Sequence, residues 1–253
     1  MTDTISRYGF PISSVFFQIC GTIFITLLLF LTLISEFIVG SISIILILLG
    51  FWYFLIYNFK KKFFTLREKI LHQMVSQAHF AGTERVLDLG TGAGYIAIQF
   101  SKLLDSGTVI GVDKYDQHTS VLGSNFFEEL KINFFGNTLE QARQNANIEK
   151  QQDKIIFVKS DLKHHFPFSN ESFNVILSSQ FLYCIPQRMI EKVLTEIDRV
   201  LKPSGKLIFF ESKKFLNWDI SNIQMVFKRL GYQTQIQPLN NMYNKCIFIA
   251  KKP

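Results

Sequence analysis

The chain has 253 residues, of which 48% are hydrophobic and 19% charged, so its composition excludes an intrinsically disordered protein. Its formal net charge is +7 at pH 7. The three cysteines, Cys20, Cys184 and Cys246, match neither a metal-ligand spacing nor a disulfide framework, so we predict no metal site. Unpaired thiols of this kind suit a reducing cytoplasm.

The first part of the chain is predicted to be a helical hairpin in a membrane. Residues 12–34 and 37–57 contain no Asp, Glu, Lys or Arg, and each run exceeds the roughly 20 residues that a spanning helix needs. A signal peptide has a shorter apolar core, of about 7–15 residues, which leaves two buried helices of a soluble core as the alternative. Basic residues at 60–62 place both termini in the cytoplasm by the positive-inside rule. We assign residues 1–59 to this hairpin.

Residues 60–82 are predicted to form a basic amphipathic linker helix, because apolar residues recur at helical spacing from Phe63 to Ala78. The helix would act as an arm at the membrane surface that borders the cofactor pocket, or it would cover the core; the two roles are compatible. From residue 60 onward the chain has 26 Lys and Arg against 18 Asp and Glu, a balance of +8. Anionic lipid attracts such a surface, although a generally basic solvated surface would look the same. A nucleic-acid partner is not expected, since no dense basic run lies outside the linker.

A glycine-rich turn follows the first strand of the remaining chain. The stretch Val86–Tyr95 reads as a buried strand, a turn with Gly90, Gly92 and Gly94, and the start of a helix. These glycines allow unusual backbone torsions and close approach of a ligand, while the N–H groups of the helix face an anion. Asp113 ends the next apolar run, where an acid can accept both hydroxyls of a ribose. The two features predict a nucleoside-binding half-sheet.

The spacing of the glycines separates two ligand classes. The dinucleotide fingerprint G-x-G-x-x-G would need glycine where the chain has Tyr95. The chain instead has an acid, Asp88, two residues before the first of three alternating glycines. S-adenosylmethionine (SAM) has no pyrophosphate, and its amino and carboxyl ends need an acid as well as backbone N–H groups. The pattern resembles motif I of class I SAM-dependent methyltransferases, and the segments downstream strengthen this resemblance.

Strands and helices alternate after the turn, which is typical of a parallel sheet with crossover helices. Strands are expected at 109–112, 155–158, 173–177, 206–211, 232–237 and 245–250, and helices at 96–100, 138–149, 188–200 and 219–230. Residues 114–138 interrupt this rhythm with many aromatic and aliphatic side chains. We expect this insertion to form a partly helical lid over the active site, or else a second small core at the sheet edge.

Several segments together resemble the type 11 family of class I SAM-dependent methyltransferases, which includes the ubiquinone and menaquinone biosynthesis methyltransferases. They occur in the family's order: Val86–Tyr95, Gly111–Asp113, Ser160–Leu162, Phe166–Phe168, Ser172–Ile176 and Arg199–Gly205. The resemblance covers about residues 83–212, with mild departures outside the pocket at Asn174 and Ser204. It implies an α/β, Rossmann-like seven-stranded sheet with helices on both faces, in a methyltransferase domain of residues 83–253.

The resemblance also implies roles for the residues around the glycine turn. Gly90, Gly92 and Gly94 would cradle the methionine end of SAM, with Asp88 near its ammonium group. Asp113 would bind the ribose hydroxyls.

The same resemblance implies roles for residues that follow the next strands. Lys114 would flank the adenine, Asp161 would accept a hydrogen bond from the adenine amino group, and Leu162 would offer a backbone N–H. Ser178 and Gln180 would border the cavity in which the methyl group is transferred.

The catalytic residues are not predicted. The family often has two histidines shortly after the fourth strand, where this chain has Tyr183 and Cys184, and a base is needed only if the acceptor must lose a proton. Ser178–Phe181 does not resemble the Asn/Asp-Pro-Pro-Tyr signature of adenine or glutamine N-methylation, which disfavours nucleic-acid bases. His164 and His165 are interpreted as part of a solvated loop.

The sequence therefore predicts a membrane-anchored SAM-dependent methyltransferase whose catalytic domain is cytoplasmic. The favoured acceptor is a lipidic or hydrophobic small molecule, because tethering concentrates an enzyme where such acceptors lie. A membrane-protein acceptor is one alternative. A catalytically silent SAM-binding module that scaffolds membrane partners is the other.

Overall fold

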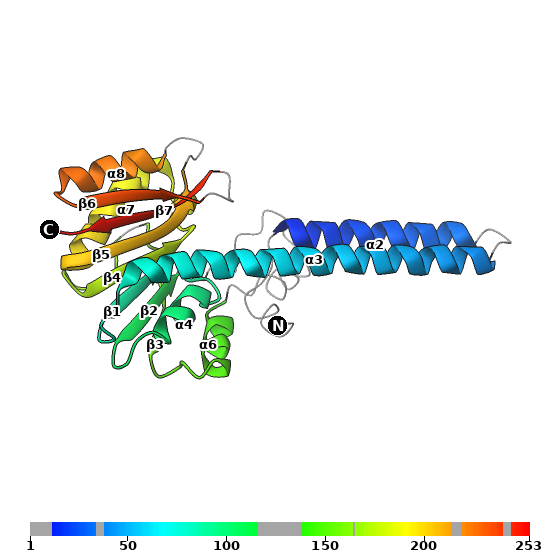
Figure 1. The fold of residues 1–253 in the computed structure, drawn as a ribbon, viewed down its shortest axis with the longest axis horizontal. Helices are drawn as coiled ribbons and strands as arrows, with labels where there is room; N and C mark the ends of the chain where they lie inside the picture. Colours follow the sequence, from blue (N-terminus) through cyan, green and yellow to red (C-terminus); the bar gives the residue numbers. More distant parts are fainter. Residues whose placement is uncertain (1–11, 34–37, 116–137, 164, 214–218, 240–243) are drawn as a thin grey trace.

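The chain forms a long helical hairpin and an α/β domain, and the hairpin projects away from the domain (Figure 1). The computed structural model describes residues 12–33, 38–115, 138–163, 165–213, 219–239 and 244–253. Most of the 114–138 insertion, for which the sequence predicts a lid, lies outside the described residues.

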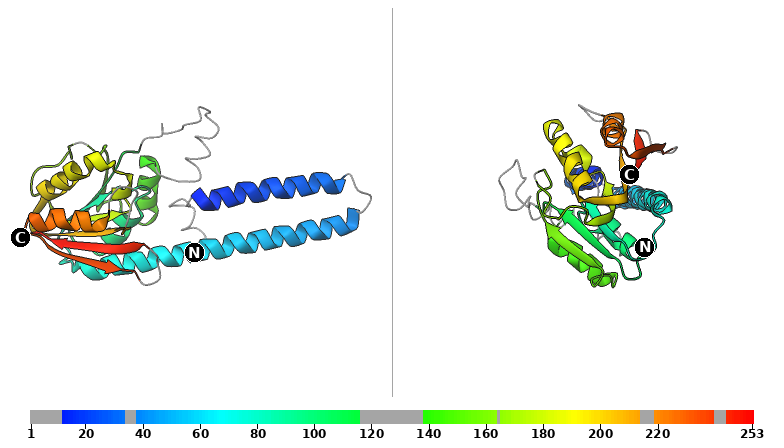
Figure 2. Two further views of the ribbon diagram at one scale, coloured as in Figure 1. Left: turned by 90° about the horizontal axis from the view of Figure 1, so that it is seen from above. Right: turned by 90° about the vertical axis from the view of Figure 1, so that its left-hand side faces the viewer.

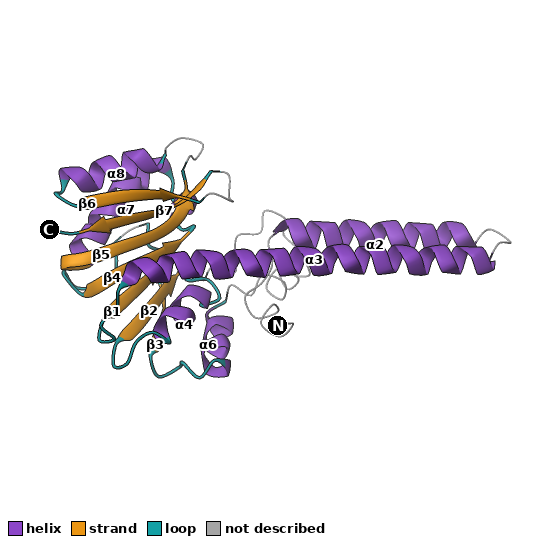
Figure 3. Cartoon of the chain, in the orientation of Figure 1, coloured by secondary structure: helices purple, strands orange, loops and turns teal. Residues whose placement is uncertain are grey.

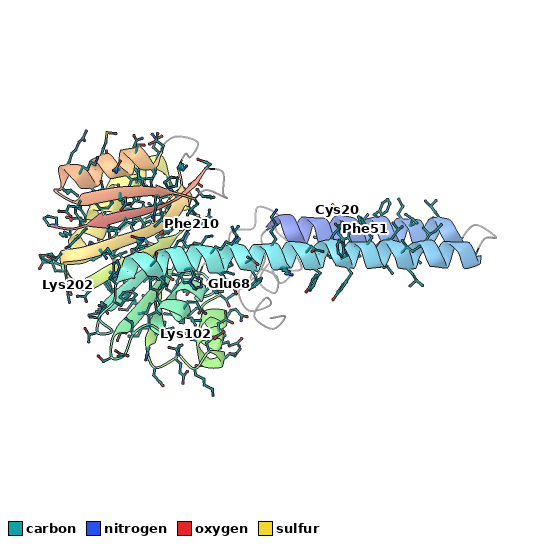
Figure 4. All side chains as sticks on the ribbon, viewed as in Figure 1. Cys20, Phe51, Glu68, Lys102, Lys202 and Phe210 are labelled. Carbon is teal, nitrogen blue, oxygen red and sulfur yellow. The ribbon has the colours of Figure 1, made fainter. Side chains whose placement is uncertain are left out.

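The hairpin consists of α2 (Ile12–Leu33) and α3 (Ile38–Ala78), which run side by side in opposite directions (Figures 1 and 2). Any side chain at Gly21 would collide with the indole of Trp52, so this glycine allows the two helices to approach closely. Cys20 and Phe51 lie at the same level along the hairpin (Figure 4). Many large apolar side chains of both helices are exposed, including Ile23, Leu27, Phe30, Leu31, Leu46, Ile47, Phe51, Tyr53 and Phe54.

The two membrane spans predicted at residues 12–34 and 37–57 are not supported by the described helices. None of the helices in the described part of the chain combines the length and the apolarity that a membrane crossing requires. Moreover, α3 does not stop before the basic residues at 60–62 but continues to Ala78. No glycine or proline lies between residues 51 and 78 to interrupt it. The predicted linker helix is thus the C-terminal half of α3.

A seven-stranded sheet forms the centre of the α/β domain (Figure 3), as the sequence predicts. Its strands are β1 (Arg85–Leu89), β2 (Thr108–Asp113), β3 (Ile155–Lys159), β4 (Phe173–Ser179), β5 (Leu201–Ser212), β6 (Gln233–Pro238) and β7 (Lys245–Lys251). The strand order is β3-β2-β1-β4-β5-β7-β6. The first five strands are parallel, and β7 pairs antiparallel with both β5 and β6. The carboxyl ends of β1 to β4 therefore lie along one edge of the domain.

Helices cover both faces of the sheet (Figures 2 and 3). The helices of the domain are α4 (Tyr95–Ser101), α6 (Leu139–Ile148), η1 (Leu182–Cys184), α7 (Gln187–Val200) and α8 (Ile220–Arg229). One apolar core joins the sheet to α7 and α8, and the other joins it to α3, α4 and α6. Ile70, Met74 and Ala78 of α3 are buried in the second core. The C-terminal half of α3 thus covers the sheet, as one of the two predicted roles requires.

Strand β5 begins earlier than the sequence predicts. The strand was expected at 206–211, after a break that separates it from the helix, but it starts at Leu201, directly after α7. The pairing with β4 shifts register between Phe173 and Val175, and Ser204 has a φ of 60°. The irregular segment is thus accommodated within the strand. Lys202 and Phe210 lie towards opposite ends of β5 (Figure 4).

Candidate active site

A cavity of about 470 Å³ lies at the carboxyl ends of the parallel strands β1 to β4. This is the edge at which open α/β sheets place their ligands. The predicted site residues that line it are Asp88, Gly90, Gly92, Asp113, Lys114, Asp161, Leu162 and Gln180. The structure therefore brings residues from four chain segments, predicted separately, around one cavity.

The glycine turn has the backbone geometry for which glycine is required. Gly90, Gly92 and Gly94 have φ values of 70°, 53° and 83°, in the left-handed region that side chains disfavour. The N–H of Gly90 donates to the carbonyl of Val112 at 2.9 Å, which ties the turn to β2. A Cβ on Gly94 would lie 2.8 Å from the ring of Phe157, so this glycine packs beneath the turn and does not line the cavity.

Asp88 is buried at the floor of the cavity, with 1% of its surface exposed. Burial raises the pKa of its carboxyl to about 7, although the hydroxyl of Thr91 donates to Oδ2 at 2.7 Å and lowers the pKa. The nearby charge of Asp113 raises it further. A cation placed beside such a carboxyl stabilises its charged form. The site therefore suits the ammonium group of a ligand.

Asp113 joins the turn to the end of β2. Its Oδ2 accepts from the N–H of Gly92 at 2.9 Å, and its Oδ1 accepts from the N–H of Tyr115 at 3.3 Å. A carboxylate offers about four lone-pair sites, so acceptor capacity remains for hydroxyl groups in the cavity. The side chain is half-buried and lines the cavity, where a diol could reach it.

Asp161 and Lys114 lie at the ends of adjacent strands and contact each other. The ammonium group of Lys114 is 3.6 Å from Oδ2 of Asp161, and the N–H of Lys163 donates to Oδ1 at 3.1 Å. The side chain of Leu162 is buried beside them. This group of residues gives the β3 end of the cavity both donors and acceptors, as an adenine edge requires.

Ser178 does not line the cavity, which corrects one predicted site residue. Its side chain is buried, and its hydroxyl donates to Oε1 of Glu211 at 3.3 Å. Ser179 and Gln180 line the cavity instead. Successive residues of a strand point to opposite faces, so Ser178 and Ser179 face different sides of the sheet. Gln180 follows the end of the strand with a φ of 60° and therefore lines the cavity together with Ser179.

Glu211 is a buried acid that the sequence did not mark as a site residue. Its side chain is fully buried, and its Oε1 accepts from the N–H of Leu182 at 2.8 Å as well as from Ser178. It thereby fixes the start of η1. The segment around η1 contributes Phe181, Cys184 and Ile185 to the cavity wall. Phe181 and Ile185 make this wall apolar, and it adjoins the glycine turn, since a Cβ on Gly90 would lie 3.0 Å from Phe181.

Two further polar residues of the site, Arg67 and Asn145, were not predicted from the sequence. Arg67 of α3 lines the cavity, and its guanidinium carbon lies 4.0 Å from the centroid of the Tyr95 ring. Asn145 of α6 is buried and donates to the carbonyl of Ala93 at 2.9 Å, which holds the turn from behind. A signal existed for Arg67, since it lies on the amphipathic helix that was expected to border the pocket.

His165, in contrast, lies outside the cavity, as expected for a loop residue. Its Nδ1 is 2.9 Å from Oε2 of Glu196, and its side chain is exposed. Its neighbour His164 is outside the described residues.

Comparison with known proteins agrees with this geometry. A protein-family model described as "Methyltransferase domain" matches residues 115–209. The chain is 27% identical over 167 residues to a demethylmenaquinone methyltransferase of Lactiplantibacillus plantarum, with 62% of this chain and 61% of that protein aligned. It is 26% identical over 167 residues to a phthiotriol/phenolphthiotriol dimycocerosates methyltransferase of Mycobacterium leprae, with 63% and 52% aligned. The aligned part of the chain thus spans between about half and three fifths of the length of these relatives.

Solved structures give the same result for the fold. A SAM-dependent methyltransferase from Aquifex aeolicus aligns with a TM-score of 0.53 at 16% identity, over 72% of this chain and 88% of that one. At 16% identity, this similarity shows the fold alone. The fold, the sequence relatives and the cavity agree: the chain carries a SAM-dependent methyltransferase domain, and SAM is its cofactor.

Proposed function

We propose that the whole protein transfers a methyl group from SAM to a lipidic or hydrophobic small molecule, and that its hairpin associates with a membrane. The main support for this proposal is that Asp88, the glycine turn, Asp113 and Asp161 all line the same cavity. Their order along the sheet edge matches the order of ammonium, ribose and adenine in SAM.

Each of these residues has a role that its geometry supports. Asp88 binds the ammonium group, Asp113 accepts from the ribose hydroxyls, and Asp161 with Lys114 holds the adenine end. SAM, when bound, supplies an electrophilic methyl group on its sulfonium. Because such a displacement depends on alignment of the reactants, the chain contributes mainly by positioning them and by excluding water. The apolar wall of Phe181, Cys184 and Ile185 is the surface that would hold the acceptor.

The lipidic class of acceptor is supported by two observations. Two relatives are named for demethylmenaquinone and for phthiotriol or phenolphthiotriol dimycocerosates, which are hydrophobic acceptors. The α2–α3 hairpin also exposes large apolar side chains, such as Ile47 at 70% and Tyr53 at 72% exposure. A lipid surface would cover such side chains favourably, at about 25 cal/mol for each Å² of apolar area.

A cytoplasmic catalytic domain remains part of the proposal. SAM is made in the cytoplasm, and the positive charge from Lys60 onward would face the anionic inner leaflet. All three cysteines are free thiols in the structure, which is compatible with a reducing compartment.

Transfer of radiolabel tests the acceptor class. The full chain is incubated with SAM labelled on its methyl group and with a total lipid extract in vesicles, and the products are partitioned between organic solvent and water. We expect label in the organic phase. Asp113→Ala should abolish most of it, whereas Asp153→Asn, a change of an exposed acid outside the cavity, should not. Label that appears only in protein or in the aqueous phase would contradict a lipidic acceptor.

Vesicle flotation tests the role of the hairpin. The full chain should float with vesicles that contain anionic lipid. Phe30→Glu and Ile47→Glu, which place charges on exposed apolar positions of the two helices, should reduce flotation. Ile148→Glu places the same charge on an exposed apolar position of α6 and should leave it unchanged. A chain that stays in solution and self-associates through the hairpin would exclude membrane association.

A catalytically silent SAM-binding module is the second candidate, and one observation favours it. The cavity-lining residues in the described part of the chain include no histidine, and Cys184 occupies the wall where the family often has one. The radiolabel experiment separates the two candidates. SAM binding by calorimetry without methyl transfer to any fraction would support the silent module.

A further inference from the structure

Arg67 belongs to the hairpin helix α3 but lies in the cavity of the α/β domain. Its guanidinium carbon is 4.0 Å from the centroid of the Tyr95 ring, and both residues line the cavity. Tyr95 begins α4 directly after Gly94, so the planar cation is held beside the glycine turn. Glu68, the next residue along α3, lies where the helix reaches the domain (Figure 4).

The charges of the cavity are distributed unevenly between its two ends. Lys114 contacts Asp161, and Lys163 donates its backbone N–H to the same carboxylate, so both belong to the β3 end. Among the described lining residues, Arg67 is the cation beside the turn. The other charges acting on Tyr95 are the acids Glu68 and Glu149.

The ligand chemistry at this end of the cavity calls for a cation. The methionine end of SAM is a zwitterion. Asp88 matches its ammonium group, whereas the backbone N–H groups of the turn offer its carboxylate neutral donors without a positive charge. A guanidinium matches a carboxylate through two parallel N–H···O hydrogen bonds. Stacking on an aromatic face fixes the plane of the guanidinium before the ligand arrives. Arg67 supplies the guanidinium, and the ring of Tyr95 supplies the aromatic face beneath it.

We propose that Arg67 binds the methionine carboxylate of SAM, and that the hairpin helix α3 thereby completes the cofactor site. The inference rests on the proposed placement of SAM in the cavity. It makes the position of α3 a determinant of cofactor affinity, since the helix that supplies Arg67 is continuous with the hairpin from Ile38 onward.

Calorimetry with three ligands tests this assignment. SAM and S-adenosylhomocysteine carry the carboxylate, whereas 5′-methylthioadenosine has the same nucleoside and sulfur but no amino acid. With the full chain, Arg67→Ala should weaken binding of the first two ligands roughly 10- to 100-fold, as expected for a charge-assisted hydrogen bond. Binding of 5′-methylthioadenosine should be unchanged. Arg67→Lys should recover part of the loss, because it keeps the charge without the planar fork.

Two further variants control this experiment. Lys69→Ala removes an exposed cation two residues along α3 and should leave all three affinities unchanged. Arg67→Met removes the charge but keeps an aliphatic stem over Tyr95, and it replaces Arg67→Ala if that variant does not fold.

The outcomes that overturn the inference are distinct. An equal loss for all three ligands would mean that Arg67 supports only the shape of the cavity. Unchanged affinity for SAM would exclude the carboxylate contact, and unchanged affinity with reduced turnover would assign Arg67 to an anionic acceptor. If the unsubstituted chain binds no SAM, the proposed cofactor site itself is wrong.

Discussion

The backbone N–H of Gly92 donates to Oδ2 of Asp113 at 2.9 Å, which joins the glycine turn after β1 to the carboxylate at the end of β2. The carboxylate thus organises the turn as well as facing the cavity. Its loss would loosen the turn and would also remove an acceptor for the ligand.

Asp113→Ala should weaken SAM binding by roughly 1–3 kcal/mol, because charge-assisted hydrogen bonds to the ribose hydroxyls are lost. Asp113→Asn should give a smaller loss, since the amide oxygen can still accept from Gly92. Isothermal calorimetry measures both, with Asp153→Asn as the control for an exposed acid. NADH should not bind measurably, because Tyr95 stands where a dinucleotide site needs glycine. A preference for NADH over SAM would overturn the cofactor placement.

Gly94→Ala should destabilise the domain by about 1–2 kcal/mol and reduce its affinity for SAM. The residue has a φ of 83°, which costs an L-residue about this much, and the new Cβ would lie 2.8 Å from the ring of Phe157. Gly50→Ala is the matched control. Gly50 lies inside α3 with no atom within 4 Å of an added Cβ, so alanine there should be neutral or stabilising. Equal thermal stability of the two variants would show that the turn does not need its left-handed torsion.

The sheet could be predicted from the sequence because its strands are buried apolar runs separated by clear turn and helix signals. β1, β2 and β3 appear within one or two residues of their predicted bounds. The start of α6 was also predictable: Thr138 caps the helix by accepting from the N–H of Gln141 at 3.0 Å. The side-chain amide of Gln141 in turn donates to Oδ1 of Asn145 at 2.9 Å, one turn further along the helix.

The cavity residues that the sequence did not predict depend on contacts between distant segments. Arg67 and Asn145 reach the glycine turn from helices that are separate from it in the chain. The helical pattern of residues 60–82 indicates only that their helix borders the pocket and does not single out Arg67, and no pattern marks Asn145. Ser178 and Ser179 are adjacent and chemically identical, and only the phase of β4 decides which one faces Glu211. The helix boundary expected near residue 59 is absent, because a change from apolar to basic side chains does not itself interrupt a helix.

Lys206→Met should destabilise the domain by about 1.5–3 kcal/mol, the range for hydrogen bonds made by a charged group. The ammonium group of Lys206 donates to the carbonyls of Gln77 and Ala78 at 2.8 and 3.3 Å, so a residue of β5 caps the C-terminus of α3. Methionine keeps the aliphatic stem and removes the cap. Lys228→Met, which changes an exposed lysine in the last turn of α8, is the control. Denaturant unfolding measures both, and equal effects would exclude a specific cap.

Glu211 should make the stability of the domain depend on pH. Burial raises the pKa of its carboxyl from 4.5 to about 7, despite the hydrogen bonds from Leu182 and Ser178 that lower it. The folded state therefore binds this proton more tightly than the unfolded state does. Its contribution is fully present below pH 4.5 and is lost as the pH rises through 7. Asp88 acts in the same direction, because burial raises its pKa from 3.8 to about 7.

Glu211→Gln isolates the contribution of this one carboxyl. The amide oxygen can still accept from the N–H of Leu182, but the side chain no longer titrates. Each pH unit between the two pKa values corresponds to roughly 1.4 kcal/mol. Between pH 4.5 and 8, the free energy of unfolding of the variant should therefore fall by about 3 kcal/mol less than that of the unsubstituted chain. Asp88 remains in both proteins, so the difference between them reports Glu211 alone. Glu191→Gln, a change of an exposed acid on α7, should behave like the unsubstituted chain. Parallel pH profiles for Glu211→Gln and the unsubstituted chain would show that Glu211 is not a proton-binding group of the folded state in this range.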